Sequence, residues 1–284
     1  MKLIIVSGLS GSGKSVALHT LEDLGYYCID NLPAGLLSAL ALELEQAAKP
    51  VEKVAVGIDA RNLPQSLQQF NDILDKLKSR GISNEILFIT CDPATLIKRF
   101  SETRRRHPLS DTHISLAEAI ELERQLLEPI ARRADLFIDT SQTTVHQLRD
   151  MVQQRVERRE DNHLSLMFQS FGFKHGIPGD ADFVFDARCL PNPHWRPELR
   201  PLTGRDEAVA QYLGNEAQVT AMVDNLTAFL DTWIPAFEAD NRSYLTVAIG
   251  CTGGQHRSVY LVEQLQHYFR TRYPNVTTRH RELP

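Results

Sequence analysis

The stretch Gly8-Leu9-Ser10-Gly11-Ser12-Gly13-Lys14-Ser15 matches the phosphate-loop pattern G-x-x-x-x-G-K-[ST] at every fixed position. The apolar run Leu3–Val6 precedes it, and residues 14–24 follow with the spacing of a helix. Glycine lets the backbone curl around an anion, and the loop amides and the helix N-terminus then face the phosphates. We predict a strand–loop–helix unit in which Lys14 bridges the β- and γ-phosphates of ATP or GTP and Ser15 ligates Mg²⁺.

The rest of the first half alternates short apolar runs with stretches of helical spacing. The runs are continuous rather than alternating, which is typical of strands buried on both faces of a parallel sheet. This order predicts an α/β fold in which helices cover the sheet. Further strands are predicted at Tyr26–Ile29, Val54–Ile58, Ile86–Thr90 and Leu136–Ile138, and helices at 14–24, 33–48, 66–79, 93–104, 115–133 and 143–158.

The second half predicts a second, smaller α/β domain. A charged run, Arg155 to Asp161, places the boundary near residues 155–163. The predicted domains are therefore 1–155, a P-loop kinase-like parallel-sheet domain, and 163–284. Strands are expected at Leu164–Gln169, Asp182–Asp186 and Tyr244–Ile249, helices at 206–238 and 257–271, a stiff proline-containing loop at 190–195 and a glycine-rich turn at 250–254.

Composition excludes several classes of protein. The chain has 284 residues, 42% of them apolar and 24% charged, as in ordinary globular proteins. The net charge of −5 gives no global field for polyanions, so any nucleic-acid surface must be a local patch. No apolar run reaches the length of a membrane span or a signal peptide. The four cysteines, Cys28, Cys91, Cys189 and Cys251, are scattered without a C-x-x-C pair, so we expect a cytoplasmic protein.

Acidic residues at strand ends are candidates for the nucleotide site. Asp59, Asp92 and Asp139 each follow an apolar run, and Asp59 is the preferred Walker B acid. Its alternative role is to cap the next helix. Asp30 ends the second run, where ligands bind in open α/β sheets, so it orients or deprotonates an acceptor or else lies in a helix N-cap region.

A basic cluster follows the fourth predicted strand. Three readings stay open: a lid of guanidinium groups over a nucleotide, a surface for RNA phosphates, or a solvated helix end. Its members are Arg99, Arg104, Arg105, Arg106 and His107.

The segment Cys251-Thr252-Gly253-Gly254-Gln255-His256-Arg257-Ser258 is a second candidate anion site, between a predicted strand and a helix. It also matches C-x₅-R-[ST], the loop of cysteine phosphatases, in which a thiolate attacks phosphorus. Those enzymes usually carry His before the Cys, where this chain has Gly250. A phosphorylated-ligand pocket, phosphatase chemistry and a structural turn therefore stay open. His194, between Pro193 and Trp195, is either a positioned donor or structural.

Taken together, these motifs resemble the RapZ-like nucleotide-binding proteins. Besides the phosphate loop, four segments carry the resemblance, which runs from residue 3 to about 281: 25–33 (GYYCIDNLP), 170–176 (SFGFKHG), 191–195 (PNPHW) and 250–258 (GCTGGQHRS).

The resemblance implies a nucleotide-binding protein with ATPase and GTPase activity and a regulatory role. It assigns ATP to Gly8–Ser15 and GTP to Asp59, Ala60, Arg61 and Asn62. It likens residues 1–155 to P-loop kinases and residues 163–284 to a sugar-phosphate-binding α/β domain. It implies a pocket for an aminosugar phosphate, glucosamine-6-phosphate, at His194, Thr252, Gly253 and Arg257.

As the second reading, the resemblance implies an RNase adapter that binds small RNA and RNase E and assembles as a homotetramer. The predicted RNA contacts are Lys174, Arg270, Arg272, Arg279 and Arg281. A small-molecule kinase and a Cys251-dependent phosphatase are the remoter alternatives.

Overall fold

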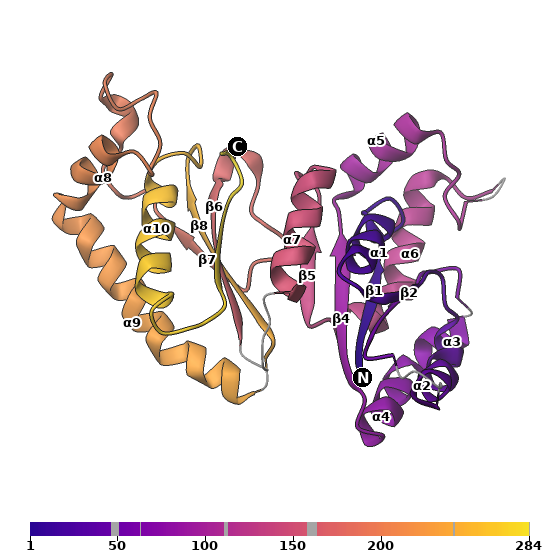
Figure 1. The fold of residues 1–284 in the computed structure, drawn as a ribbon. Helices are drawn as coiled ribbons and strands as arrows, with labels where there is room; N and C mark the ends of the chain where they lie inside the picture. Colours follow the sequence, from indigo (N-terminus) through magenta and orange to yellow (C-terminus); the bar gives the residue numbers. More distant parts are fainter. Residues whose placement is uncertain (47–50, 63, 111–112, 158–163, 241, 284) are drawn as a thin grey trace. The chain divides into compact units, whose positions relative to one another are not determined.

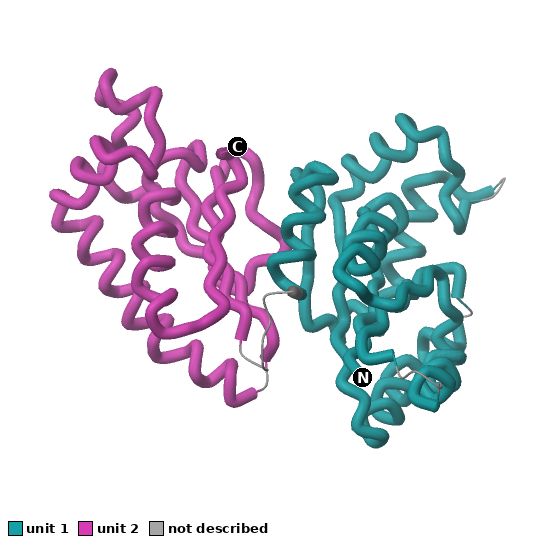
Figure 2. Tube along the Cα trace, viewed as in Figure 1, with its two compact units in different colours: residues 1–157 teal, residues 158–284 magenta. Residues whose placement is uncertain are grey.

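A computed structural model describes residues 1–46, 51–62, 64–110, 113–157, 164–240 and 242–283. The chain divides into two compact units, residues 1–157 and 158–284 (Figure 2). Each unit carries a parallel sheet with helices, so the predicted α/β class is confirmed (Figure 1). The predicted boundary region, 155–163, falls partly on residues 158–163, which lie outside the described residues.

The sheet of the first unit has the strand order β2-β3-β1-β4-β5, and every pair is parallel. The strand that leads into the phosphate loop is therefore central, and its apolar residues are buried on both faces. Because all strands run the same way, their carboxyl ends share one edge of the sheet. The strands are β1 (Lys2–Gly8), β2 (Tyr27–Ile29), β3 (Lys53–Gly57), β4 (Ser83–Thr90) and β5 (Leu136–Asp139).

Helices cover both faces of this sheet. One group packs around α6 and includes α3, α4 and α5, while α1 packs against α7. The predicted helix 33–48 begins later, because Pro33 precedes a 3-10 turn, η1 (Ala34–Leu36); residues 47 and 48 lie outside the described part. The predicted helix 66–79 is two helices, which meet at Gln69. The helices are α1 (Lys14–Asp23), α2 (Leu37–Gln46), α3 (Pro64–Gln68), α4 (Phe70–Ser79), α5 (Pro93–Thr103), α6 (Leu116–Ala131) and α7 (Val145–Glu157).

The sheet of the second unit has the order β7-β8-β6-β9 and is also parallel throughout. Its last strand was not predicted, because Val276-Thr277-Thr278-Arg279-His280 is short and mostly polar. The predicted helix 206–238 is interrupted at Asn215 and Glu216. The elements are β6 (Ser165–Gly172), η2 (Phe173–His175), β7 (Phe183–Asp186), η3 (Pro193–Trp195), α8 (Glu207–Gly214), α9 (Ala217–Ala239), β8 (Tyr244–Cys251), α10 (Arg257–Phe269) and β9 (Val276–His280).

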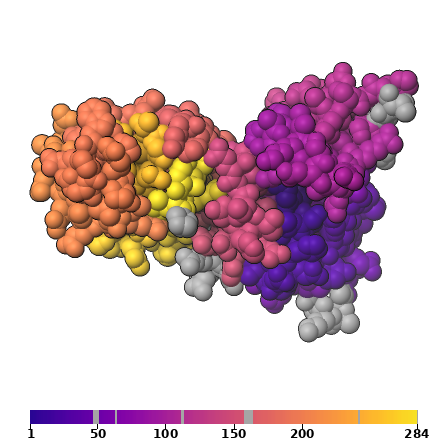
Figure 3. All heavy atoms as spheres, turned by 90° about the horizontal axis from the view of Figure 1, so that it is seen from above, coloured from indigo at the N-terminus to yellow at the C-terminus, as the bar shows by residue number. Residues whose placement is uncertain are grey.

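The core of the second unit lies between the sheet and its helices. Helix α10 packs on β6, β8 and β9, and α9 packs on α10. Leu166, Phe168, Val247, Leu261 and Phe269 are among the buried residues of this core. In Figure 3 the orange residues of α8 and α9 form one side of the unit, next to the yellow C-terminal segment. In the described ranges, no helix is both long and apolar enough to cross a membrane.

Candidate functional site

The phosphate loop joins the carboxyl end of β1 to the first turn of α1. Two of its glycines are required by the backbone. A Cβ on Gly8 would lie 1.9 Å from the carbonyl oxygen of Ile89 on β4, so only glycine fits beside that strand. Gly13 precedes α1 with a φ of 116°, in the region that favours glycine. The loop is thus tightly curled at the N-terminus of a helix, where anions bind.

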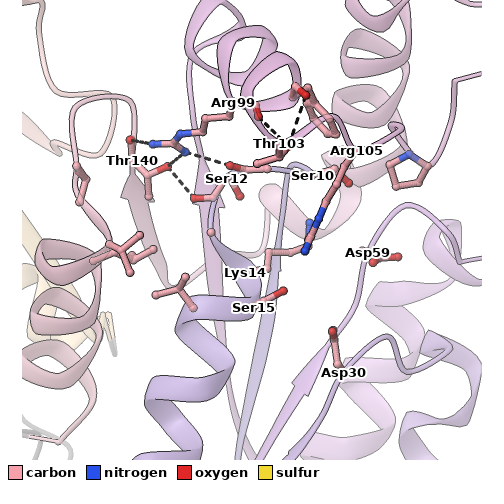
Figure 4. A pocket seen from close by; sticks show the side chains of 18 of the residues that line it. Ser10, Ser12, Lys14, Ser15, Asp30, Asp59, Arg99, Thr103, Arg105 and Thr140 are labelled. Carbon is pink, nitrogen blue, oxygen red and sulfur yellow. Dashed lines mark hydrogen bonds between the residues drawn. The ribbon is translucent and has the colours of Figure 1, made fainter.

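A cavity of about 670 Å³ opens over this loop. Figure 4 shows Lys14 and Ser15 between Asp30 and Asp59 on one side and Arg99 and Thr140 on the other. The cavity is larger than a pair of phosphates requires and falls in the size range of small-molecule sites. Its further lining includes Ser10 to Val16, Arg61, Phe100, Thr103, Arg105, Arg106, Thr144, Val145 and Leu148.

Lys14 carries the positive charge of the loop. Its Nζ donates a hydrogen bond to the carbonyl of Gly8 at 2.7 Å, across the loop. Burial lowers the pKa of the ammonium group, and the carboxylates of Glu123, Asp59 and Asp30 oppose this shift. The net effect is a lowered pKa, so burial outweighs the attraction of the three carboxylates at the loop.

Glu123 of α6 fixes the tip of the loop, a role that the sequence analysis missed. Its carboxylate accepts the Ser10 amide at 2.8 Å and the Ser10 hydroxyl at 2.7 Å. The ring of His107 lies 3.0 Å from it, and both side chains are fully buried. Burial opposes ionisation of Glu123, but His107, Lys14 and Ser10 outweigh it and hold its pKa below the usual range. The sequence did hold a signal: Glu123 occupies the buried stripe of an amphipathic helix, with Ile120 and Leu127.

Asp59 is the strand-end acid that reaches the cavity. Its carboxylate binds Arg61 through Nε at 2.9 Å and Nη2 at 2.5 Å and also accepts the Arg61 amide. Burial opposes ionisation, but these bonds hold the pKa of Asp59 below its usual range. Of the other candidates, Asp92 caps α5 by accepting the Thr95 amide, and Asp139 accepts the Ser141 amide. Among the described residues, neither of these lines the cavity.

Asp30 lines the cavity from the loop after β2. It accepts the amide of Asn31, while the residue before η1 is Pro33, so Asp30 does not cap that helix. Asn31 has a φ of 52°, an uncommon backbone conformation for a residue other than glycine. Asn62 holds this loop, since its Oδ1 accepts the Ala34 amide and its Nδ2 donates to the Leu32 carbonyl. The two loops that follow β2 and β3 are thereby joined.

The predicted basic cluster divides into three parts. Arg99, Arg105 and Arg106 line the cavity. Arg99 also donates to the carbonyls of Gly11 and Thr140, which ties α5 to the phosphate loop. Arg104 ends α5 with a φ of 52°, and His107 is buried against Glu123. His107 therefore does not belong to a solvated basic surface.

A second cavity, of about 440 Å³, lies in the second unit. Of the four predicted pocket residues, Thr252 and Arg257 line it, together with Arg188. Arg257 is the first residue of α10 and is only 4% exposed. Its Nη1 donates to the carbonyls of Arg188 and Leu190, and its Nη2 to the Thr252 hydroxyl. Its Nε is buried without a hydrogen-bond partner among the described residues.

The other two predicted pocket residues lie elsewhere in the described structure. His194 is not part of this lining; its ring lies 6.2 Å from that of buried His256. Gly253 also lies off the lining, and a Cβ there would come within 3.9 Å of the Lys174 side chain. The structure therefore brings together two of the four residues.

Cys251 closes the glycine-rich turn from within. Its Sγ accepts the Gly254 amide and lies 3.2 Å from the Ser258 hydroxyl. Burial opposes ionisation of the thiol, but these contacts and the charge of Arg257 lower its pKa. The side chain is 3% exposed and, in the described structure, is not part of the cavity lining. This geometry favours the structural-turn reading over a nucleophile.

The predicted RNA contacts occupy two edges of the second sheet. Lys174 follows β6 and Arg281 follows β9, so both lie at the carboxyl edge. Arg270 and Arg272 follow α10, which returns to the amino end of β9, and Arg272 lies over the ring of Tyr268. Arg279 lies within β9. The predicted contacts thus come from three places: the carboxyl edge of the sheet, the end of α10 and strand β9.

Strand order, phosphate loop and the acid beside it define a P-loop domain of the kinase type, followed by a second parallel-sheet domain. Two family models cover nearly all of the chain: the RapZ-like N-terminal domain matches residues 1–160, and the RapZ C-terminal domain matches residues 164–284. The chain belongs to the RapZ-like family.

Relatives of similar length share most of the sequence. A nucleotide-binding protein of Methylococcus capsulatus is 59% identical over 100% of this chain and 97% of its own length. Another, of Nitrosococcus oceani, is 58% identical over 100% of both chains. Among solved structures, shikimate kinase from Bacteroides thetaiotaomicron is 16% identical and covers 55% of this chain and 98% of its own, with a TM-score of 0.36.

Proposed function

We propose that the first unit binds ATP or GTP at the cavity over Gly8–Ser15 and hydrolyses it slowly in a regulatory role. The observation that carries the proposal is the cavity itself, which places a phosphate loop and Lys14 opposite Asp30 and Asp59. Two relatives that match this chain over 97% and 100% of their own length are named nucleotide-binding proteins. The Ser15 hydroxyl and the Asp59 carboxylate are oxygen ligands of the kind that suits Mg²⁺, which would neutralise charge on the phosphates when bound.

The test is calorimetric titration of the full chain with the imido analogues of ATP and GTP in Mg²⁺. Lys14→Ala removes the loop charge, and we expect binding to weaken by about 100-fold or more, with turnover reduced as well. Lys98→Ala is the matched control, because Lys98 is a surface residue in a weak pair with Glu102. Equal binding by wild type and Lys14→Ala would overturn the proposal.

A second candidate function belongs to the second unit: sensing of an aminosugar phosphate in the cavity of Thr252 and Arg257. The buried, unpartnered Nε of Arg257 at the start of α10 favours an anionic ligand there. Titration with glucosamine-6-phosphate tests it, with Thr252→Val as the variant that removes the hydroxyl but keeps the bonds of Arg257 to the carbonyls of Arg188 and Leu190. Binding unchanged in Thr252→Val, or absent in wild type, would count against it.

The adapter role, with small RNA and RNase E as partners, rests on the resemblance alone. If the chain contacts six or more RNA phosphates, raising the salt from 50 to 200 mM should weaken RNA binding by about 10³-fold or more. Small-RNA binding measured across that range on the full chain is the test. A flat salt dependence would exclude recognition of the RNA backbone by Lys174 and the arginines of 270–281.

A further inference from the structure

We propose that Asp59-Ala60-Arg61-Asn62 is the γ-phosphate side of the phosphate-loop site rather than a separate site for GTP, and that Arg61 distinguishes nucleoside triphosphates from diphosphates. ATP and GTP are then alternative ligands of one cavity. This inference rests on the proposed function of the first unit and deepens it.

The first argument is position. Strand β3 pairs directly with β1, so the segment that follows β3 emerges beside the phosphate loop. Asp59 and Arg61 line the same cavity as Lys14, and both act on the charge of Lys14. A nucleotide seated on the loop therefore meets this segment, and a second nucleotide there would compete for the same space.

The second argument is that the only side-chain amide of the segment, that of Asn62, is not free to read a guanine base. Asn62 is 8% exposed, and its amide group binds the loop after β2. Its Oδ1 accepts the Ala34 amide, and its Nδ2 donates to the Leu32 carbonyl. Asp59 and Ala60 are buried, and the Asp59 carboxylate faces Arg61. Of the four residues only Arg61 is exposed, so the segment meets a ligand through one guanidinium group.

The third argument comes from the opposite end of the cavity. Helices α5 and α7 follow β4 and β5, which lie on the other side of β1 from β3, and they contribute the apolar side chains of Phe100, Val145 and Leu148 to the cavity lining. Apolar side chains suit a flat base. A base at that end directs the phosphates over the loop towards Asp59 and Arg61. The end of the cavity at β3 is therefore the phosphate end.

Arg61 has the exposure and chemistry of a phosphate reader. Its side chain is 50% exposed, whereas that of Asp59 is 7% exposed, so the arginine can turn from the fixed carboxylate towards a ligand. Guanidinium groups bind phosphate through two parallel hydrogen bonds. A diphosphate ends one phosphate earlier and leaves Arg61 on Asp59. The predicted role is therefore selectivity for the third phosphate, whichever base follows.

The experiment measures binding of four ligands to the full chain in Mg²⁺: the imido analogues of ATP and GTP, ADP and GDP. We expect one ligand per chain and mutual displacement of the two triphosphate analogues. Arg61→Ala weakens both analogues by about 10- to 100-fold and changes ADP and GDP by less than about 3-fold. Arg61→Lys falls between wild type and Arg61→Ala. Arg132→Ala, in a surface pair with Glu128, is the matched control.

Three results would overturn this inference while leaving nucleotide binding in place. They are two ligands bound per chain without mutual displacement, loss of the GTP analogue alone in Arg61→Ala, and equal weakening of diphosphates and triphosphates in that variant. By contrast, a wild-type chain that binds none of the four ligands refutes the proposed function, and this inference with it. Thermal unfolding of Arg61→Ala and Arg61→Lys checks that both variants are folded.

Discussion

The loops Gly8–Ser15 and Cys251–Ser258 have the same frame and use their cations differently. Each follows a buried parallel strand and leads into a helix. Lys14 lines an open cavity and bonds a carbonyl of its own loop. Arg257 is buried and bonds two carbonyls of a facing segment, at Arg188 and Leu190. Both cations line a cavity, but most of the Arg257 guanidinium is already bound within its own unit, whereas Lys14 binds a single carbonyl of its loop.

The largest expected loss of stability comes from removing Glu123, which holds the tip of the phosphate loop through Ser10. Glu123→Ala leaves His107 and Ser10 without their buried partner, so we expect the first unit to lose about 3–5 kcal/mol of stability. Urea unfolding followed by circular dichroism measures the loss. Tryptophan fluorescence should not report it, because both tryptophans, Trp195 and Trp233, lie in the second unit.

Glu121→Ala is the matched control for Glu123→Ala. Glu121 lies on the same helix, in an exposed pair with Arg124, so its loss should cost at most about 1 kcal/mol. If the two glutamate variants unfold at the same urea concentration, the loop tip does not depend on Glu123.

The next largest effect concerns Arg257, whose bonds to the Arg188 and Leu190 carbonyls we expect to stabilise the second unit. Arg257→Met leaves buried carbonyls without donors, and we expect the second unit to lose about 2–3 kcal/mol. Here the tryptophan signal should shift. Arg188→Met breaks a surface pair with Asp186 and a contact over the Phe173 ring, but it keeps the backbone carbonyl that Arg257 binds, so it should shift the signal much less. An Arg257 variant as stable as wild type would mean that its network is not structural.

Acid should destabilise the first unit through Glu123 and Asp59. The folded pKa values of Glu123 and Asp59 lie below the ordinary values of 4.5 and 3.8. The unfolded chain therefore takes up these protons first, so their contribution is present above the ordinary values and lost as pH falls through the folded ones. The urea midpoint measured by circular dichroism should fall as the pH is lowered from 7 to 3.5. In Glu123→Gln this fall should be less steep, because the variant lacks the titrating carboxylate. An unchanged slope in that variant would contradict the assignment.

The smallest effect concerns Cys251. In Cys251→Ser the hydroxyl still accepts the Gly254 amide, so we expect a change within about 1 kcal/mol. Cys251→Val has no acceptor, and leaving that amide unpaired should cost about 1–3 kcal/mol. Fluorescence-detected unfolding compares the two variants. Equal stabilities would show that the sulfur acts only by its volume.

The sequence predicted strands best where both faces of the strand are buried. Strands β1 and β3 and most of β4 are continuous buried runs inside the sheet, whereas the edge strands β2 and β5 are partly exposed. Strand β9 escaped because only its pairing with β6 makes the polar run Val276–His280 a strand. The helix break at Gln69 carried no glycine or proline signal, whereas Gly214 and Asn215 mark the second break with a helix-stop signal that the sequence analysis missed.

The candidate site was predictable only where its residues are contiguous. The phosphate loop is a local pattern, and Asp59 could be found because a strand delivers it to the edge of the sheet. Glu123 lies 113 residues from its partner Ser10, and no local pattern encodes that contact. Likewise, the bonds of the Asn62 amide to Ala34 and Leu32 form only where the turns after β2 and β3 meet in the fold, so the local sequence does not predict them.

The bond between Glu123 and Ser10 has a consequence for how a ligand arrives. Because the protein's own carboxylate orders the loop tip, the backbone entropy of this turn is lost during folding and not at binding. Association should then proceed without a slow rearrangement of the loop. Its observed rate should rise linearly with ligand concentration, and in Glu123→Gln it should level off at a ceiling set by loop ordering.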